Sequence, residues 1–273
     1  IAQNESNRLL GMSDELSKKV IGQENAIEKL SKAIKRTRVG LKDPRKPIGS
    51  FVFLGPTGVG KTELAKVLAQ YLFDKEDSLI RVDMSEYMEK FSISRLVGAP
   101  PGYVGYDQGG LLTESVTKHP HSVILLDEME KAHPEVFNIL LQVMDHGTLT
   151  DNNGRKADFR NVVLVMTTNA GAHDMSRASM GFNAQDHTSD GAEIIKKTFS
   201  PEFRNRLDAM ITFNPVSIEV IKTVVDKFLV ELQAQLDEKK VQLEVSEKVR
   251  DWIAEKWKDI TMGTRPMQRH SLI

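Results

Sequence analysis

Eight consecutive residues carry the strongest chemical signal in this chain: Gly55-Pro56-Thr57-Gly58-Val59-Gly60-Lys61-Thr62. They match G-x-x-x-x-G-K-[ST], in which backbone N–H groups surround phosphates, the lysine reaches the β- and γ-phosphates, and the last hydroxyl ligates Mg²⁺. The alternative is a glycine-rich turn that binds nothing. The flanks disfavour it, because a strand-like run (50–54) enters the motif and a helix-like run (63–69), whose N-terminus favours anions, leaves it. The sequence therefore predicts an ATP/ADP site with Thr62 as a ligand of Mg²⁺.

Two acids, Asp127 and Glu128, follow a second apolar run, residues 122–126. Ligands of parallel sheets bind beyond the carboxyl ends of the strands, so this pair is expected to face the phosphates. Asp127 would hold Mg²⁺ and Glu128 would polarise the attacking water. A solvated turn is the alternative, which the phosphate motif disfavours. Asn169 ends a third run, where it either contacts the γ-phosphate or the water, or simply forms a turn.

The elements that must position these residues alternate between strand and helix. Apolar runs at 79–83, 122–127, 162–167 and 209–213 predict strands, and residues 13–20 (with Ser13 as N-cap) and 23–38 predict helices. Near-continuous apolar strands between helices indicate a parallel sheet covered on both faces. We expect an α/β ATPase domain with three layers over residues 1–214.

The pattern changes after Pro215. Residues 217–239 predict a long amphipathic helix and residues 241–245 a strand, and a further helix carries Trp252 and Trp257. We expect a small α-rich domain over residues 215–273, and expect it to be partial.

Composition excludes several classes of function. The formal net charge of −1 gives no electrostatic case for nucleic acid or membrane binding, and no apolar run approaches the ~20 residues that span a bilayer. Cysteine is absent, which excludes disulfides and suits a cytoplasmic protein. The histidines show no metal-ligand spacing, with His119 and His121 the nearest to a pair. The polar start without Met suggests a cut inside a longer protein rather than a signal peptide.

Taken in order, these motifs resemble the AAA+ ATPases of the Clp/Hsp100 family, most closely the second ATPase module of its ClpA branch. The resemblance also includes Phe203-Arg204-Asn205-Arg206-Leu207-Asp208 and Gly263-Thr264-Arg265-Pro266, and it runs from about Val20 to Arg269. Residues 151–161 favour the ClpA branch over ClpB or ClpC. The resemblance implies the P-loop AAA+ fold, with the small domain following the sheet.

The resemblance also implies roles outside the phosphate motif. Val20 and Ile21 would flank the adenine. Arg206 would be an arginine finger for the nucleotide of a neighbouring subunit, a contribution on the order of 10³–10⁵ in rate. Arg265 would be a sensor arginine that touches nucleotide within its own chain. The local alternatives are an ion pair for Arg206, whose competitor for the finger role is Arg204, and a solvated turn for Arg265.

A tyrosine between glycines stands in the segment Gly102-Tyr103-Val104-Gly105. An ordinary surface turn is the local interpretation. The resemblance instead implies a central-pore loop in which Tyr103 and Val104 grip an extended polypeptide through sequence-tolerant contacts. A second pore-facing loop is expected near residues 147–155.

The tripeptide Met180-Gly181-Phe182 lies in a long polar stretch, 175–191. It stands where the family docks a ClpP-like protease, usually with Ile or Val, then Gly, then an apolar residue. Met and Phe depart from the ClpA habit of Ile-Gly-Leu. The alternative is a loop that folds these apolar residues onto its own domain.

Together the resemblance implies an ATP-dependent unfoldase and translocase. It would act as a ring, expected to be a hexamer, that threads unfolded or tagged polypeptides into a ClpP-like protease, with an adaptor bound through an N-terminal domain outside this sequence. A ClpB-like disaggregase without a protease is one alternative, and an ATP-gated assembly scaffold or loader is another. A small-molecule kinase would leave Arg206, Arg265 and Tyr103 without a role.

Overall fold

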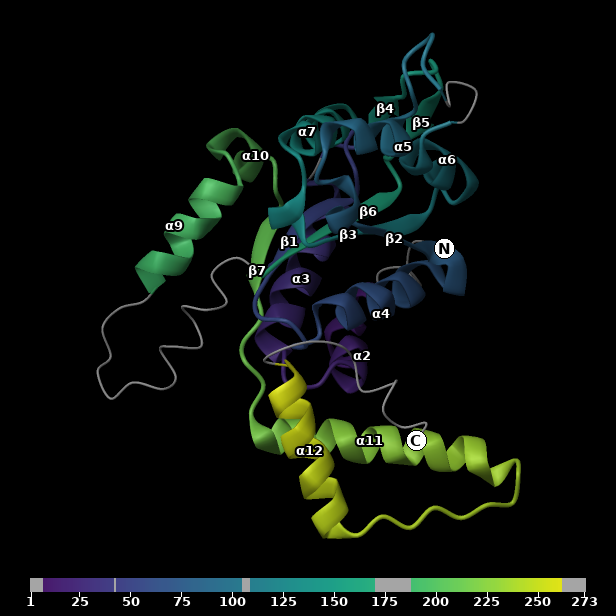
Figure 1. Ribbon diagram of the computed structural model, residues 1–273, viewed down its shortest axis with the longest axis vertical. Helices are drawn as coiled ribbons and strands as arrows, with labels where there is room; N and C mark the ends of the chain where they lie inside the picture. The colour runs from purple at the N-terminus through teal and green to yellow at the C-terminus, as the bar shows by residue number, and fades with distance from the viewer. Residues whose placement is uncertain (1–6, 42, 105–108, 170–187, 262–273) are drawn as a thin grey trace.

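A parallel β-sheet forms the centre of the molecule. The computed structural model describes residues 7–41, 43–104, 109–169 and 188–261. The strands of this sheet are β1 (Gly49–Leu54), β2 (Leu79–Asp83), β3 (Ser122–Asp127), β6 (Val162–Thr168) and β7 (Ala209–Thr212). They lie in the order β2-β3-β6-β1-β7, and every neighbouring pair is parallel (Figure 1).

Both faces of the sheet are buried. Along β1, Phe51 and Phe53 enter one apolar cluster, whereas Val52 and Leu54 enter the other. The first cluster is closed by α2 (Met12–Lys19), α3 (Glu24–Arg36) and α4 (Lys61–Phe73). The second is closed by α5 (Ile93–Val97), α6 (Leu111–Lys118), α7 (Pro134–His146) and α10 (Pro201–Asn205). The structure thus confirms the predicted three-layer α/β fold, in which strands buried on both sides read as continuous apolar runs.

Shorter elements connect these layers. Helix α9 covers Thr188–Thr198, η1 is a π turn over Thr37–Leu41, and the 3₁₀ turns are η2 (Glu76–Ser78), η3 (Met84–Tyr87), η4 (Lys90–Ser92) and η5 (Met129–Lys131). An antiparallel hairpin of β4 (Thr148–Thr150) and β5 (Lys156–Asp158) precedes β6. The predicted strands and helices do not include this hairpin, because each of its strands is only three residues long.

Helix boundaries differ from the prediction at two places. Helix α2 begins at Met12 after Gly11, so Ser13 is inside the helix and the prediction that it caps the N-terminus is wrong. Helix α3 ends at Arg36, and the chain continues as a π turn to Leu41, in which Gly40 has a φ of 80°. The α-helix therefore ends two residues before the predicted end at residue 38, and the left-handed Gly40 prevents an α-helix from continuing beyond it.

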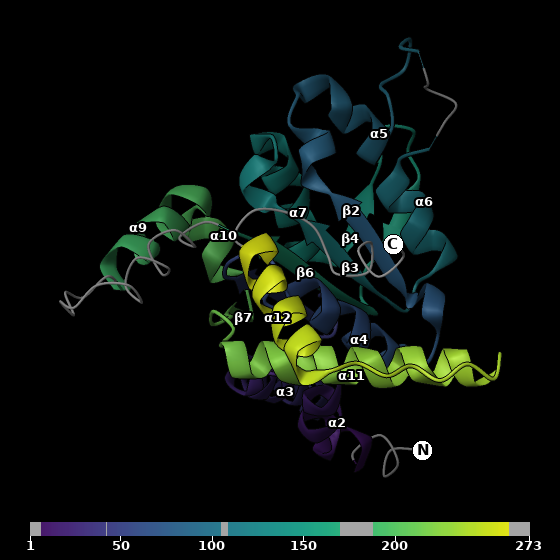
Figure 2. The ribbon, with the colours of Figure 1, turned by 60° about the horizontal axis from the view of Figure 1, so that its bottom comes forward.

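Two helices, α11 (Ile218–Asp237) and α12 (Glu247–Thr261), lie at the end of the molecule opposite the β4–β5 hairpin (Figures 1 and 2). Ser217 caps α11 by accepting a hydrogen bond from the Val220 N–H. The two helices share a third apolar cluster built on Ile221, Val225 and Ala254. Among the described helices α11 is the longest, and none of them is long and apolar enough to cross a membrane.

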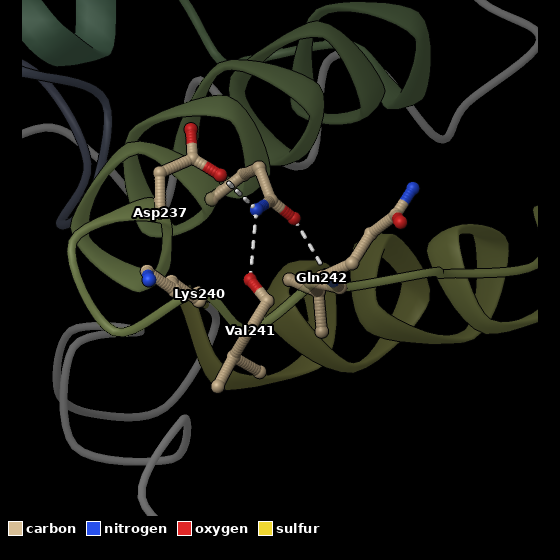
Figure 3. Close-up of a pocket in the computed structure, with 6 residues that line it drawn as sticks. Asp237, Lys240, Val241 and Gln242 are labelled. Atoms are coloured by element: carbon tan, nitrogen blue, oxygen red, sulfur yellow. Dashed lines mark hydrogen bonds between the residues drawn. The ribbon is translucent and has the colours of Figure 1, made fainter.

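The predicted strand at 241–245 is wrong. This segment is not assigned to any sheet, and its backbone groups bond to the side chain of Gln233 instead (Figure 3). Gln233 Nε2 donates to Val241 O (3.1 Å), and Leu243 N donates to Gln233 Oε1 (2.7 Å). These groups line an open hollow of about 420 Å³ that has no link to the phosphate motif. Apolar alternation predicted a strand here, but the glutamine of α11 satisfies the backbone without a partner strand.

Candidate nucleotide site

The phosphate motif forms a loop between β1 and α4, as predicted. Gly55 and Gly60 have φ values of 150° and 105°, which lie outside the range that L side chains adopt easily. A methyl group on Gly55 would also lie 2.8 Å from Phe213 O. The loop therefore depends on glycine at both positions. It ends where α4 begins at Lys61, so the free N–H groups of the first helical turn point from the end of the loop.

Lys61 is the charged centre of this loop. Its side chain is buried, with 7% of the residue exposed, and Nζ donates to Gly55 O (2.5 Å), Thr168 O (3.0 Å) and Asn169 Oδ1 (2.6 Å). All three acceptors are uncharged. Burial lowers the pKa of Lys61 to about 8, although nearby carboxylates oppose this shift. A buried ammonium without a charged partner in contact fits an anionic ligand.

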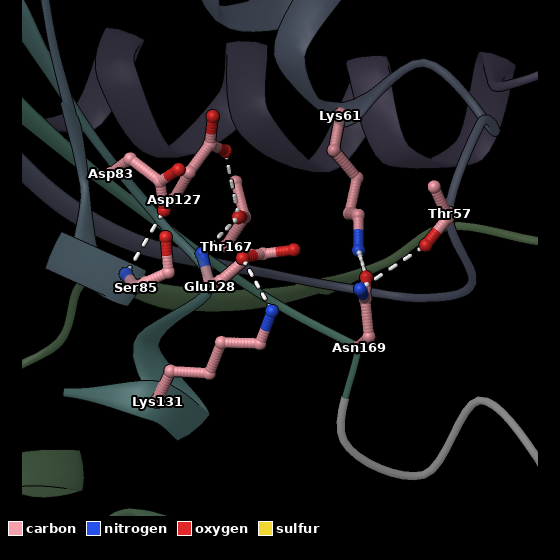
Figure 4. Close-up of polar contacts among 9 residues, drawn as sticks. All are labelled: Thr57, Lys61, Asp83, Ser85, Asp127, Glu128, Lys131, Thr167 and Asn169. Carbon is pink, nitrogen blue, oxygen red and sulfur yellow. Dashed lines mark hydrogen bonds and ion pairs between the residues drawn. The ribbon is translucent and has the colours of Figure 1, made fainter. Parts of the chain in front are cut away.

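Asn169 joins β6 to the phosphate loop. Its Oδ1 accepts from Lys61, and its Nδ2 donates to Thr57 Oγ1 (3.1 Å; Figure 4). Thr62 lies half-buried in the first turn of α4, next to Lys61. The structure thus brings Thr57, Lys61 and Asn169 together as the sequence predicted. The amide of Asn169 has both a donor and an acceptor directed at the loop that would hold the phosphates.

Asp127 and Glu128 lie at the carboxyl end of β3, in the same view (Figure 4). Asp127 Oδ1 accepts from Thr167 Oγ1 (2.9 Å), and Oδ2 accepts from Arg81 Nε (2.7 Å). The Glu128 N–H donates to Thr167 Oγ1 (3.1 Å), and Glu128 has a left-handed φ of 61°. Strained backbone of this kind is common where a side chain must be aimed.

The carboxylate of Glu128 is held by Lys131, whose Nζ lies 2.9 Å from Oε2. This hydrogen bond raises the pKa of Lys131. Sequence reasoning did not identify Lys131, Thr167 or Arg81 as parts of the site. Only Arg81 carried a signal, since it is the one charge within the apolar run 79–82.

The segment expected to flank adenine lies between the phosphate loop and α11. Val20 is buried, and its Cγ1 would lie 3.2 Å from a methyl group on Gly60. Ile21 is half-buried beside it. Gly22 has a φ of 88°, and a methyl group there would lie 2.7 Å from Val220 Cγ1. The apolar side chains and the close approach of α11 make this segment suited to an aromatic base.

Gln23 is a further residue that the sequence analysis missed. Its side chain is buried; Nε2 donates to Val59 O (3.0 Å) and to Asn214 O (2.9 Å), and Oε1 accepts from the Asn214 N–H (3.1 Å). One side chain thus ties the phosphate loop to the connection that leads to α11. The signal was a glutamine at the start of an otherwise amphipathic helix.

The structure does not place Arg206 at the phosphate loop of its own chain. Its Nε lies 2.5 Å from Asp145 Oδ1, and its Nη2 lies 3.3 Å from Glu202 Oε1. The hydrogen bond that Arg206 donates to Asp145 raises the pKa of its guanidinium. Arg204, the competing arginine, has a buried Nε without a hydrogen-bond partner among the described residues.

Tyr103 and Val104 stand at the surface in the loop between α5 and α6. Tyr103 is 70% exposed and Val104 fully exposed, and Gly102 before them has a φ of 87° with open space around it. Gly105, the last residue of the predicted pore loop, lies outside the described residues. The same is true of four other predicted site residues: Arg265, Met180, Gly181 and Phe182.

The comparisons with known proteins decide the family. Residues 46–210 match the family model "AAA domain (Cdc48 subfamily)", and residues 216–270 match "C-terminal, D2-small domain, of ClpB protein". The chain belongs to the Clp/Hsp100 family of AAA+ ATPases. The predicted family and its ATPase class are therefore confirmed.

Individual relatives agree. A ClpA homolog protein from Fuscovulum blasticum is 54% identical over 98% of this chain and 34% of its own length. A chaperone protein ClpB from Propionibacterium freudenreichii is 51% identical over 98% of this chain and 31% of its own length. A solved structure of Hsp104 with ATPγS and FITC casein superposes with a TM-score of 0.84 at 39% identity, covering 98% of this chain and 46% of that one. This Clp/Hsp100 chain thus spans about a third of the length of the curated relatives it matches.

A nucleotide is the ligand that an AAA+ ATPase binds, and the residues present fit one. Lys61 offers a buried cation, the loop offers free N–H groups, and Val20 offers an apolar contact. Bound Mg²⁺ would neutralise charge on the phosphates during hydrolysis. Asp127 and Thr62 suit that ion, because Mg²⁺ in nucleotide sites takes one or two protein oxygens alongside phosphates and water.

Proposed function

We propose that this ATPase module couples ATP hydrolysis to the unfolding and translocation of polypeptides. The observation that carries the proposal is the exposed Tyr103-Val104 pair on a loop of the ATPase domain itself. Exposed aromatic and aliphatic groups at a loop tip gain nothing for the folded state and mark a contact surface. Their contacts are indifferent to sequence, as a motor that moves many polypeptides requires. The Hsp104 relative, solved with casein, adds support for a polypeptide substrate.

Within this function Glu128 polarises the attacking water, and Lys61, Asn169 and the 55–62 loop hold the phosphates. Thr62 and Asp127 hold Mg²⁺, and Val20 and Ile21 flank the adenine. The carboxylate of Glu128 rests on Lys131 rather than on Lys61, so it is not neutralised by the phosphate-binding lysine. Arg265 acts as the sensor arginine from the small domain.

Arg206 completes the site of a neighbouring copy in a ring, which we propose to be a hexamer. Support comes from its place in this chain, where its partners are Asp145 and Glu202 and not the phosphate loop. Only 26% of the Arg206 side chain is exposed, so the two carboxylates already orient the guanidinium before any neighbour arrives. Hydrolysis would then depend on assembly.

We further propose that the chain divides into an ATPase domain, 1–214, and a small domain, 215–273. The third apolar cluster supports this division, because α11 and α12 pack on each other. Gln23 hydrogen-bonds Asn214 at the junction and Val59 in the phosphate loop. Nucleotide bound in the loop would therefore influence the relative orientation of the two domains.

The test of the proposed function uses the full-length protein and a tagged, folded fluorescent substrate. Tyr103→Ala should abolish loss of substrate fluorescence while ATP turnover stays within about twofold, since Tyr103 touches none of the nucleotide residues. Tyr103→Phe should retain most unfolding because the ring remains. Trp252→Ala removes another exposed aromatic, at the other end of the molecule, and should change neither activity. Unfolding by Tyr103→Ala at the unmodified rate would overturn the proposal.

The translocated polypeptide has two candidate destinations. We propose delivery to a ClpP-like protease through Met180-Gly181-Phe182. The second candidate is a ClpB-like disaggregase, because a ClpB protein is nearly as similar to this chain (51% identical) as a ClpA homolog (54%). Met180→Ser with Phe182→Ser should remove stimulation of a ClpP-type peptidase, whereas Asn183→Ser in the same segment should not. Disaggregation that persists in a protein unable to stimulate the peptidase would favour the second candidate.

A further inference from the structure

The loop that carries Tyr103 is closed at its base. A methyl group on Gly110 would lie 2.5 Å from Leu96 O and 2.6 Å from Val97 Cα, so the outgoing and returning backbones touch. Gly98 has a left-handed φ of 83° and turns the chain outward at this point. We call residues 97–98 and 109–110 the loop neck. Loops whose ends meet in this way move as units about the points that fix them.

The turn of the β4–β5 hairpin, residues 151–155, is bonded to the outgoing side of the neck. The backbone N–H of Asn152 donates to Val97 O (2.8 Å), and its side-chain Nδ2 donates to Gly98 O (2.7 Å). One residue therefore satisfies two consecutive carbonyls of the neck.

The same turn is bonded to the returning side through Asp151, a buried carboxylate. Its Oδ2 accepts from Thr113 Oγ1 (3.0 Å) in the first turn of α6. The same hydroxyl also lies within hydrogen-bond distance of Gly110 O (3.1 Å), so Thr113 stands between Asp151 and a carbonyl of the neck. A buried carboxylate is retained only where such donors satisfy it.

Asp151 also fixes the shape of its own turn. Its Oδ1 accepts from the N–H groups of Asn153 (2.9 Å) and Arg155 (2.8 Å). Arg155 then reaches Glu114 of α6, with Nη1 3.1 Å from Oε1. The turn is thus rigid internally and attached to both sides of the neck.

The hairpin itself is anchored in the hydrolysis half of the sheet. It follows α7, which begins six residues after Glu128, and it leads into β6, which ends beside Asn169. Leu149 and Ala157 pair across the hairpin and are both buried in the core. Force on the neck would therefore pass into α7, which follows Glu128 in the chain, and into β6, which leads to Asn169.

We propose that Asn152 and Asp151 are positioning residues that hold the neck of the Tyr103 loop against load. This inference rests on the proposed translocation function and deepens it. In this proposal the hairpin turn has a structural role. Asn152 and Asp151 are hydrogen-bonded to residues at and beside the neck, so these polar groups are not available to contact a polypeptide in a pore. Loss of the side-chain bonds would leave hydrolysis intact and weaken the grip on substrates that resist unfolding.

The experiment compares Asn152→Ala with Asn161→Ala in the full-length protein. Asn161 is an exposed asparagine before β6, so its loss is a matched control. Each variant is given one tagged substrate in a folded and in a chemically unfolded form. Asn152→Ala should process the unfolded form normally and the folded form about tenfold more slowly, as loss of a hydrogen bond implies. ATP turnover should stay within about twofold for both variants.

A second readout does not depend on activity. Amide hydrogen exchange over residues 96–104 should rise in Asn152→Ala and in Asp151→Asn, and should not change in Asn161→Ala. Unchanged exchange together with unchanged unfolding of the folded substrate would overturn the positioning role. If Tyr103→Ala leaves unfolding intact, the translocation function fails instead. The exchange result then decides by itself whether the turn holds the neck.

Discussion

The nucleotide site and the Tyr103 loop are built in opposite ways. At the nucleotide site, Lys61 and Asp127 are buried and each polar group already has a partner in the same chain. At the loop, Tyr103 and Val104 are exposed, and the side chain of Asn152 donates to the neck carbonyl of Gly98. Preorganised groups favour one charged ligand and one reaction. Exposed apolar groups on a fixed base favour a polypeptide whose side chains differ at each step of translocation.

The two regions also differ in what they lack. The loop needs only a substrate. At the nucleotide site, no arginine among the described residues is hydrogen-bonded to Lys61 or Asn169, and Arg81 contacts Asp127 instead. Arg206 sits elsewhere on Asp145. The comparison therefore predicts that a defect in ATP hydrolysis depends on which subunit lies next to the site in the ring. A defect in substrate binding by the Tyr103 loop does not.

The largest effect is expected from Arg206→Ala. If the guanidinium acts on a neighbour's nucleotide, ATP turnover should fall by roughly 10³-fold or more while nucleotide affinity changes little. Steady-state turnover and fluorescent nucleotide binding measure the two. Arg204→Ala is the matched control, and a loss there with normal turnover in Arg206→Ala would exchange the two assignments.

A mixing experiment separates action in trans from action in cis. Rings formed from equal amounts of Arg206→Ala and Glu128→Gln subunits contain about a quarter of interfaces with both groups intact, since each interface of a closed ring joins unlike faces. Turnover should then recover well above that of either variant alone. Mixed rings as inactive as their parents would place Arg206 in its own site.

The next effect is that of Glu128→Gln alone. Removal of a general base should lower ATP turnover by roughly 10²-fold or more, and ATP binding should persist because Lys61 and the phosphate loop are untouched. Single-turnover hydrolysis and binding measure it. Lys131→Met leaves Glu128 in place and should cost far less. Full activity in Glu128→Gln would remove the carboxylate from the mechanism.

The sequence predicted the parts of both regions that depend on local pattern. The phosphate loop, the acids that end β3 and the parallel sheet follow from motifs and from continuous apolar strands, and the structure has them. For Tyr103, the glycines on both sides predicted a surface turn, and the family resemblance implied a pore loop. Its exposure agrees with both the surface-turn and the pore-loop interpretations.

The contacts that join distant segments could not be predicted. Gln23 reaches Asn214 across 191 positions, and Asn152 reaches Gly98 across 54. Neither pair has a periodic signal, because a single polar side chain that bonds a backbone carbonyl leaves no pattern in one sequence. The prediction of a strand at 241–245 was wrong for the same reason, because the side chain of Gln233 forms hydrogen bonds with the backbone of this segment.

A smaller effect concerns the pH dependence of nucleotide binding. Burial lowers the pKa of Lys61 to about 8, so the free protein loses this charge as the pH rises above that value. Phosphates need the ammonium, so binding must restore a proton, and ATP affinity should fall about tenfold from pH 7 to pH 9. Calorimetry in two buffers of different ionisation enthalpy should show proton uptake at pH 9 and almost none at pH 7. Constant affinity with no uptake would contradict the shifted pKa.

The smallest effect is expected at the edge of the site, where Arg81 shares Asp127 with Thr167. Arg81 Nε lies 2.7 Å from Asp127 Oδ2, but 59% of the Arg81 side chain is exposed, so water screens most of this ion pair. Mg²⁺ must compete with the guanidinium for the same carboxylate. Arg81→Met should therefore lower the Mg²⁺ concentration that half-saturates turnover by about threefold.

The control for Arg81 keeps the charge and changes only the geometry. Arg81→Lys should retain a Mg²⁺ requirement near that of the unmodified protein, because a cation still faces Asp127. The opposite direction, a higher Mg²⁺ requirement in Arg81→Met, would mean that the arginine orients Asp127 for the ion instead of competing with it. In that case the edge of the nucleotide site would be held as the loop neck is held, by a partner that positions a neighbouring group, and the contrast between the two regions would narrow.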